Sequence, residues 1–168
     1  MDACILINYL RLGRLDILVK SASLRPVVTR SVLDEITDKS QREELKDSIS
    51  AGRIELIDPD PSALDMFIAA IESGLGRGEA SCIAFSIATG ILLGCDEKAR
   101  CFRRLTEAAG LSGRIVTTRD LVVMAILEGR LCIDDANILL GELRTRFRFN
   151  VPDIRQCEIK GSLTIGSK

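Results

Sequence analysis

Ile91-Leu92-Leu93-Gly94-Cys95-Asp96 is an uninterrupted apolar run that ends on a carboxylate. The run has the length of a strand, and a strand without polar alternation is expected where both faces of a sheet are covered. In open parallel sheets, ligands bind beyond the carboxyl ends of the strands. We therefore predict a buried parallel strand over 91–95, with Asp96 projecting at the edge where a site would lie.

Strand-like and helical segments alternate on both sides of this run. Such alternation indicates right-handed crossovers and a parallel sheet with helices on both faces. The predicted fold class is therefore α/β, a three-layer α/β/α arrangement with a central, mostly parallel sheet. Further strands are predicted over 26–29, 54–57 and 115–118. Helices are predicted over 5–22 with a break at Gly13, over 31–36 with Ser31 as the cap, and over 39–49, 62–73, 79–88, 97–109, 121–128 and 135–147.

The length of 168 residues fits a single domain with a substantial core. We predict that residues 1–150 form this domain, with 130–150 as its C-terminal helical part. Residues 151–168 are weakly patterned, and we expect them to form a weakly structured tail.

Composition excludes several kinds of chemistry. The chain has no histidine, so it cannot build a Ser-His-Asp triad or a histidine-ligated zinc or iron site. Its 23 Lys and Arg residues nearly balance 24 Asp and Glu residues, so any contact with nucleic acid must use a local basic patch. Six cysteines without a CxxC pair favour free thiols in a reducing, cytoplasmic compartment. No apolar stretch reaches the length of a membrane span.

Four carboxylates are predicted to converge at the sheet edge. Asp96 follows a strand, Asp2 and Glu79 lie at helix starts, and Glu35 lies on the helix after the first predicted strand. Taken singly, each is readily explained as a turn or helix-surface charge, so the prediction rests on the set. Converging carboxylates repel one another unless a cation is present, and an oxygen-only cluster suits Mg²⁺ or Mn²⁺.

The order of these acids resembles that of the PIN-domain ribonucleases, especially VapC-type toxins of toxin–antitoxin pairs. The resemblance covers about residues 2–130. The motifs that carry it are Asp2-Ala3-Cys4-Ile5-Leu6-Ile7, Val27-Val28-Thr29 with Ser31-Val32-Leu33-Asp34-Glu35-Ile36, Leu75-Gly76-Arg77-Gly78-Glu79-Ala80, and Leu92-Leu93-Gly94-Cys95-Asp96-Glu97-Lys98-Ala99-Arg100.

The resemblance implies an Mg²⁺- or Mn²⁺-dependent endoribonuclease that hydrolyses RNA phosphodiesters. The implied catalytic and metal-binding acids are Asp2, Glu35, Glu79 and Asp96, with Glu97 as an outer or substitute ligand. Asp120 is an alternative to Asp96. The resemblance also implies a homodimer and a cognate antitoxin that covers the acids with a basic side chain.

Hydroxyl and basic side chains near the same edge are candidates for holding ligands. Thr117 and Thr118 could hydrogen-bond a ligand carboxylate, and Arg77 and Arg100 could bind the RNA backbone. Solvated helix charges explain each arginine equally well. The same two interpretations apply to Lys98, Arg103, Arg104 and Arg119.

The sequence departs from the family pattern at two places. Asp2 directly follows Met1, so the N-terminal strand that leads into this acid in the family is expected to be missing or truncated. Cys4 replaces an Asn or Ser that can hydrogen-bond near the metal. Both departures favour the alternative of a catalytically impaired PIN-like module that binds RNA or protein. A receiver-like phospho-acceptor domain is a third interpretation, but it would require a Lys after the last strand.

Overall fold

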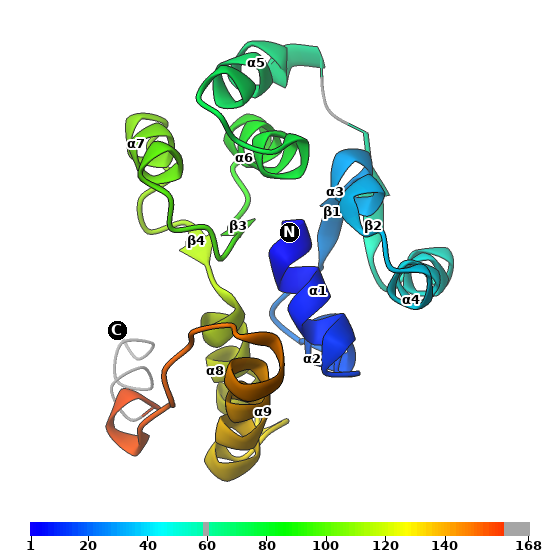
Figure 1. Cartoon of the computed structure of the whole chain (residues 1–168), viewed down its shortest axis with the longest axis vertical. Coiled ribbons are helices and arrows are strands. Elements are labelled where there is room, and N and C mark those ends of the chain that lie inside the picture. The colour runs from blue at the N-terminus through cyan, green and yellow to red at the C-terminus, as the bar shows by residue number, and fades with distance from the viewer. Residues whose placement is uncertain (59–60, 160–168) are drawn as a thin grey trace.

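The computed structural model describes residues 1–58 and 61–159, and Figure 1 shows its course. Strand β1 (Val27–Thr29) pairs in parallel with β2 (Glu55–Ile57), and β3 (Leu93–Gly94) pairs in parallel with β4 (Ile115–Val116). The predicted α/β class with parallel strands is confirmed. The strands are shorter than predicted, and among the described residues they form two separate two-stranded sheets.

The helices surround these strands (Figure 1). The predicted break at Gly13 is confirmed, because Gly13 takes a positive φ of 61° between the first two helices. The cap predicted at Ser31 is wrong: the Thr29 hydroxyl caps the helix by accepting from Val32 N at 3.3 Å. The helices are α1 (Ala3–Arg11), α2 (Asp16–Val19), α3 (Arg30–Glu35), α4 (Lys39–Ser50), α5 (Leu64–Glu72), α6 (Arg77–Thr89), α7 (Arg100–Ala108), α8 (Thr118–Leu127) and α9 (Ile133–Phe147), with a 3₁₀ turn, η1 (Pro61–Ala63).

The amino terminus joins the two sheets. The Met1 ammonium group donates to Val27 O at 2.7 Å, and Asp2 N donates to Gly94 O at 2.9 Å. The start of α1 therefore lies between β1 and β3 (Figure 1).

A largely apolar cavity of about 450 Å³ lies next to this junction. Its lining includes Leu24 and Pro26 before β1 and Leu92 before β3. Ile91 and Leu92 are 41% and 46% exposed, so the prediction that both faces of this run are covered is wrong for its first half. The physical reason is that both side chains line this open cavity.

The core is continuous from α1 to the C-terminal helices. Ile5, Leu6 and Tyr9 of α1 are fully buried, and α8 packs against α9 beneath them. Beyond α9, Val151 and Ile154 are also buried. Residues 160–168 of the predicted tail lie outside the described residues.

The six thiols form no disulfide. In the part of the chain that the structure describes, no helix is both long and apolar enough for a membrane span.

Candidate functional site

Asp2 is a buried carboxylate that does not perform the usual role of its position. It is the N-cap of α1, yet its side chain accepts no hydrogen bond from the first turn of the helix. Oδ2 lies 3.7 Å from the Cys95 thiol, and Oδ1 is buried without a hydrogen-bond partner. Because a buried polar oxygen without a donor is costly, Asp2 is positioned for a partner other than its own helix.

Asp96 follows β3, and donors from two helices fix its carboxylate. Thr118 donates from its backbone N to Oδ1 at 2.8 Å and from its hydroxyl to Oδ2 at 2.5 Å. Asn8 Nδ2 donates to Oδ2 at 3.2 Å and to the Thr118 hydroxyl at 3.1 Å. The Tyr9 hydroxyl donates to Thr118 O at 2.8 Å and so holds the start of α8 against α1.

Asn8 was not identified from the sequence. The available signal was a single amide within the otherwise apolar face of the first helix, where a buried polar group requires partners. Its partners lie 88 and 110 residues away along the chain. Only the fold identifies them.

Glu79 and Glu97 are neighbouring carboxylates, and each accepts from backbone N–H groups at the start of a helix or turn. Glu79 closes a capping box at the start of α6 by accepting from Gly76 N at 3.1 Å. Burial is the largest cause that raises the pKa of Glu79, and the charges of Asp2 and Glu97 raise it further against that hydrogen bond. Glu97 accepts from the backbone N of Lys98 and of Ala99, at 2.6 and 2.5 Å.

Glu35 lies beside Glu79 at the edge of this group. Its Oε1 accepts from Gly78 N at 2.7 Å, in the first turn of α6, where the helix dipole favours a negative charge. A Cβ on Gly76 would lie 3.5 Å from Glu35 Oε1 and 3.7 Å from Glu79 Oε2. A Cβ on Gly78 would lie 2.2 Å from Glu35 Oε2. The glycines of the Leu-Gly-Arg-Gly-Glu motif therefore allow both carboxylates to approach the helix start.

Gly78→Ala is expected to destabilise the protein by about 1 kcal/mol in urea unfolding. The methyl group would displace Glu35 and cost its charge-assisted hydrogen bond, which outweighs the better helix propensity of alanine. Gly141→Ala in α9 is the matched control, because its Cβ would meet only Arg144 Nη2 at 3.6 Å. The control should be neutral or stabilising. In a Glu35→Ala background Gly78→Ala should no longer destabilise, and a persistent loss there would contradict this account.

We call Asp2, Glu79, Asp96 and Glu97 the acid cluster. Burial is the largest cause that raises the pKa of Asp96; the two Thr118 hydrogen bonds lower it and the charge of Asp2 raises it again. Asp2 thus acts electrostatically on both Glu79 and Asp96. The structure brings together four of the five predicted acids, with Glu35 beside Glu79.

The acid cluster supplies carboxylate oxygens, the ligands that Mg²⁺ and Mn²⁺ prefer, but these oxygens are held in positions set by other hydrogen bonds. Within residues 1–58 and 61–159, no three His, Cys, Asp or Glu side chains are grouped closely enough to hold a metal ion. The reason is visible in the hydrogen bonds: Glu79, Asp96 and Glu97 each accept from backbone N–H groups. The Asp2 oxygen without a donor and the oxygen-only set are suited to Mg²⁺ or Mn²⁺.

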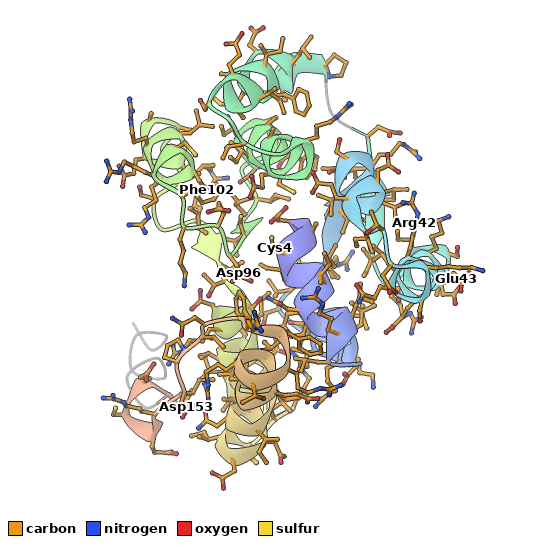
Figure 2. The ribbon with its side chains drawn as sticks, viewed as in Figure 1. Cys4, Arg42, Glu43, Asp96, Phe102 and Asp153 are labelled. Atoms are coloured by element: carbon orange, nitrogen blue, oxygen red, sulfur yellow. The ribbon has the colours of Figure 1, made fainter. Side chains whose placement is uncertain are left out.

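The two thiols at the site stay protonated. Cys4 is exposed and lies near Asp96 (Figure 2), and both residues line the same cavity. Desolvation, followed by the charges of Asp2, Glu79 and Asp96, raises the pKa of Cys4 to about 12. Burial and then Asp2 raise the pKa of Cys95 as well. In the absence of a cation, these raised pKa values disfavour the thiolate form of both cysteines at neutral pH.

The remaining predicted residues occupy different surroundings. Thr117 and Asp120 form the capping box of α8, with Thr117 N donating to Asp120 Oδ2 at 2.9 Å. Arg77 and Arg100 are exposed first residues of α6 and α7. Arg119 instead contacts the segment after α9, donating to Asp153 O at 3.0 Å. Lys98, Arg103 and Arg104 are exposed at or near α7.

The fold and the acid cluster define a nuclease-like α/β domain. A family model described as PIN domain matches residues 1–158, so the chain belongs to the PIN-domain family. PIN domains are generally nucleases. No curated protein and no solved structure matches the chain.

Proposed function

We propose that this protein is an Mg²⁺- or Mn²⁺-dependent endoribonuclease of the VapC toxin type that hydrolyses RNA phosphodiesters. The observation that carries the proposal is the buried Asp2 oxygen without a donor, next to Glu79 and Asp96. Placing three carboxylates from separate elements next to one another lowers the stability of the metal-free protein, and the pKa values of two of them are raised. A divalent cation would offset that cost.

The chain's own residues divide into ligands and positioning groups. Asp2, Glu79 and Asp96 would hold the cation after Glu79 and Asp96 turn away from their backbone donors. Glu97 of the same cluster and the neighbouring Glu35 would be further ligands after leaving theirs. A bound divalent ion supplies an activated water and neutralises charge on the leaving oxygen. Thr118 and Asn8 fix the orientation of Asp96. The exposed arginines that would hold the RNA backbone are Arg77 and Arg100.

Asp96→Asn is expected to lower Mn²⁺-dependent cleavage of structured RNA by roughly 100-fold or more, because the substitution removes a ligand charge without changing its shape. Asp120→Asn is the matched control, since the Asp120 carboxylate accepts from Thr117 N in the capping box of α8, and this variant should cleave like the wild type. The assay is gel-resolved cleavage with and without EDTA. Equal cleavage by the wild type and Asp96→Asn would overturn the catalytic role of Asp96.

A second candidate function is a catalytically impaired PIN-like module that binds RNA or protein. Two observations favour it: Cys4 stands where the family has a hydrogen-bonding side chain, and Glu35 is held by Gly78 N rather than directed at the other acids. Its signature would be RNA binding without Mn²⁺-dependent cleavage. The Asp96 assay combined with an RNA-binding measurement therefore separates the two functions.

Homodimerisation and capture by an antitoxin belong to the same proposal. Leu64, Ile68 and Ile71 are exposed on α5 at helical spacing, and Leu127 and Ile138 are exposed on the C-terminal helices. These apolar side chains offer surfaces for a second copy and for an antitoxin segment. A basic antitoxin side chain would meet the acid cluster. A reducing cytoplasmic location and a single domain over residues 1–150 remain predictions.

A further inference from the structure

A cavity of about 300 Å³ lies next to the acid cluster. Its lining includes Asp96 and Glu97 on one hand, and the end of α9 with Phe147, Arg148 and Phe149 on the other. The lining of the cavity is thus acidic next to the proposed reaction centre. At the C-terminal end of α9 it is basic and aromatic. This second group of lining residues has no part in holding the acids.

Two cations at the cavity lack a carboxylate partner within the described parts of the chain. Arg11 lies with its guanidinium 5.3 Å from the centre of the Phe147 ring, and Arg148 is exposed. The neighbouring arginines behave differently. Arg146 pairs with Glu142, and Arg144 pairs with Asp153 at 2.7 Å. Arg11 and Arg148 therefore remain available to an anionic ligand.

The backbone directs Arg148 by a conformation that arginine rarely adopts. Arg148 has φ 54° and ψ 26°, and among described residues other than glycine it alone has a positive φ. Phe149 N donates to Leu143 O at 3.1 Å and closes the helix end. Glycine is the usual residue at such a C-terminal position, and another residue costs on the order of 1 kcal/mol. This strained turn brings Arg148 and Phe149 to the cavity.

We propose that this cavity is a subsite for one nucleotide of single-stranded RNA adjacent to the phosphate that is cut. Arg148 and Arg11 bind a backbone phosphate, and Phe149 provides a surface on which the base stacks. Proteins that bind single-stranded nucleic acid stack the bases on aromatic side chains and bind the backbone phosphates with positively charged groups. An aromatic ring beside free guanidinium groups provides both contacts. This subsite rests on the proposed ribonuclease function, which places the phosphate that is cut at the acid cluster.

Arg148→Gly separates RNA binding from folding. Glycine suits φ 54°, so thermal stability should be unchanged or higher, while affinity for a fluorescein-labelled 12-residue oligouridylate in EDTA should fall roughly 5-fold or more. The slope of log affinity against log salt should also become shallower by about 0.7, the value for one lost contact to a single strand. Arg53→Gln removes one exposed charge near the end of α4 and is the matched control.

Phe149→Leu tests the stacking contact. Leucine preserves apolar packing against the core but has no aromatic face, so oligouridylate affinity should fall roughly 5-fold or more with the salt dependence unchanged. Equal affinities of wild type, Arg148→Gly and Phe149→Leu would overturn the subsite. A polyglutamate peptide that competes as well as oligouridylate per charge would also overturn it, in favour of an acidic protein segment.

The binding and cleavage assays test the subsite and the ribonuclease function separately. Arg148-dependent RNA binding without any Mn²⁺-dependent cleavage would support the subsite and overturn the ribonuclease. Asp96-dependent cleavage with an unchanged KM in Arg148→Gly would support the ribonuclease and overturn the subsite.

Discussion

Asp2→Asn is expected to make the metal-free protein more stable and to remove its thermal response to Mn²⁺. The wild type buries Asp2 Oδ1 without a donor, beside the charges of Glu79 and Asp96. An asparagine amide removes one of these charges and adds a donor for its acidic neighbours. We expect a gain of about 1–2 kcal/mol in EDTA, because relieving a buried charge without a partner has effects of this order.

The measurement is thermal unfolding in EDTA and in saturating Mn²⁺. For the wild type, Mn²⁺ at about 100 times its Kd should add about 2.7 kcal/mol, or roughly 5–10 °C in Tm. Asp2→Asn should start higher in EDTA and shift little with Mn²⁺. Asp47→Asn, on the exposed face of α4, is the control that should keep the wild-type response. A full Mn²⁺ shift in Asp2→Asn would show that Asp2 is not a ligand.

Fusing Val-Ile-Val-Ile-Val directly before Met1 is expected to raise Tm by about 10 °C. The added strand would enter between β1 and β3, where Met1 N already pairs with Val27 O and Asp2 N with Gly94 O. It would run back along residues 23–26 and 91–92, which line the 450 Å³ cavity, and would cover the exposed Ile91 and Leu92.

The size of this effect follows from opposing contributions. Each buried Val or Ile contributes about 1.5–3 kcal/mol and each ladder hydrogen bond about 1 kcal/mol, whereas ordering each residue costs about 1–2 kcal/mol. A net gain near 3 kcal/mol corresponds to about 10 °C for a protein of this size.

A Val-Pro-Val-Pro-Val fusion is the matched control. Proline cannot donate to a ladder, so this variant should keep the Tm of the original chain. Slower amide hydrogen exchange of β1 and β3 in the first fusion would locate the gain at the junction. Equal Tm values for the two fusions would show that the gap between the sheets does not accept a strand.

Local sequence patterns were sufficient to predict most helices and strands and the α/β fold class. The break at Gly13 and the approximate helix positions follow from residue spacing and turn chemistry, which act over a few residues, and the parallel pairing follows from the alternation of strands and helices along the chain. The prediction that both faces of 91–95 are covered failed at Ile91 and Leu92, because both side chains line the cavity beside the start of α1 and coverage depends on how the elements pack. The cap at α3 moved from Ser31 to Thr29 because the helix starts directly at the end of β1.

The candidate site divides in the same way. The sequence by itself determined which carboxylates follow strands or begin helices, and so which acids could meet at one edge of the sheet. Only the tertiary structure decided that Asn8 and Thr118 hold Asp96, that Glu35 bonds to Gly78 N, and that Arg148 reaches the cavity beside the acids. These contacts join residues that are 22 to 88 positions apart for the hydrogen bonds. Spacing along a chain sets which side chains share a face of one helix or strand, whereas contacts between elements depend on how their faces pack.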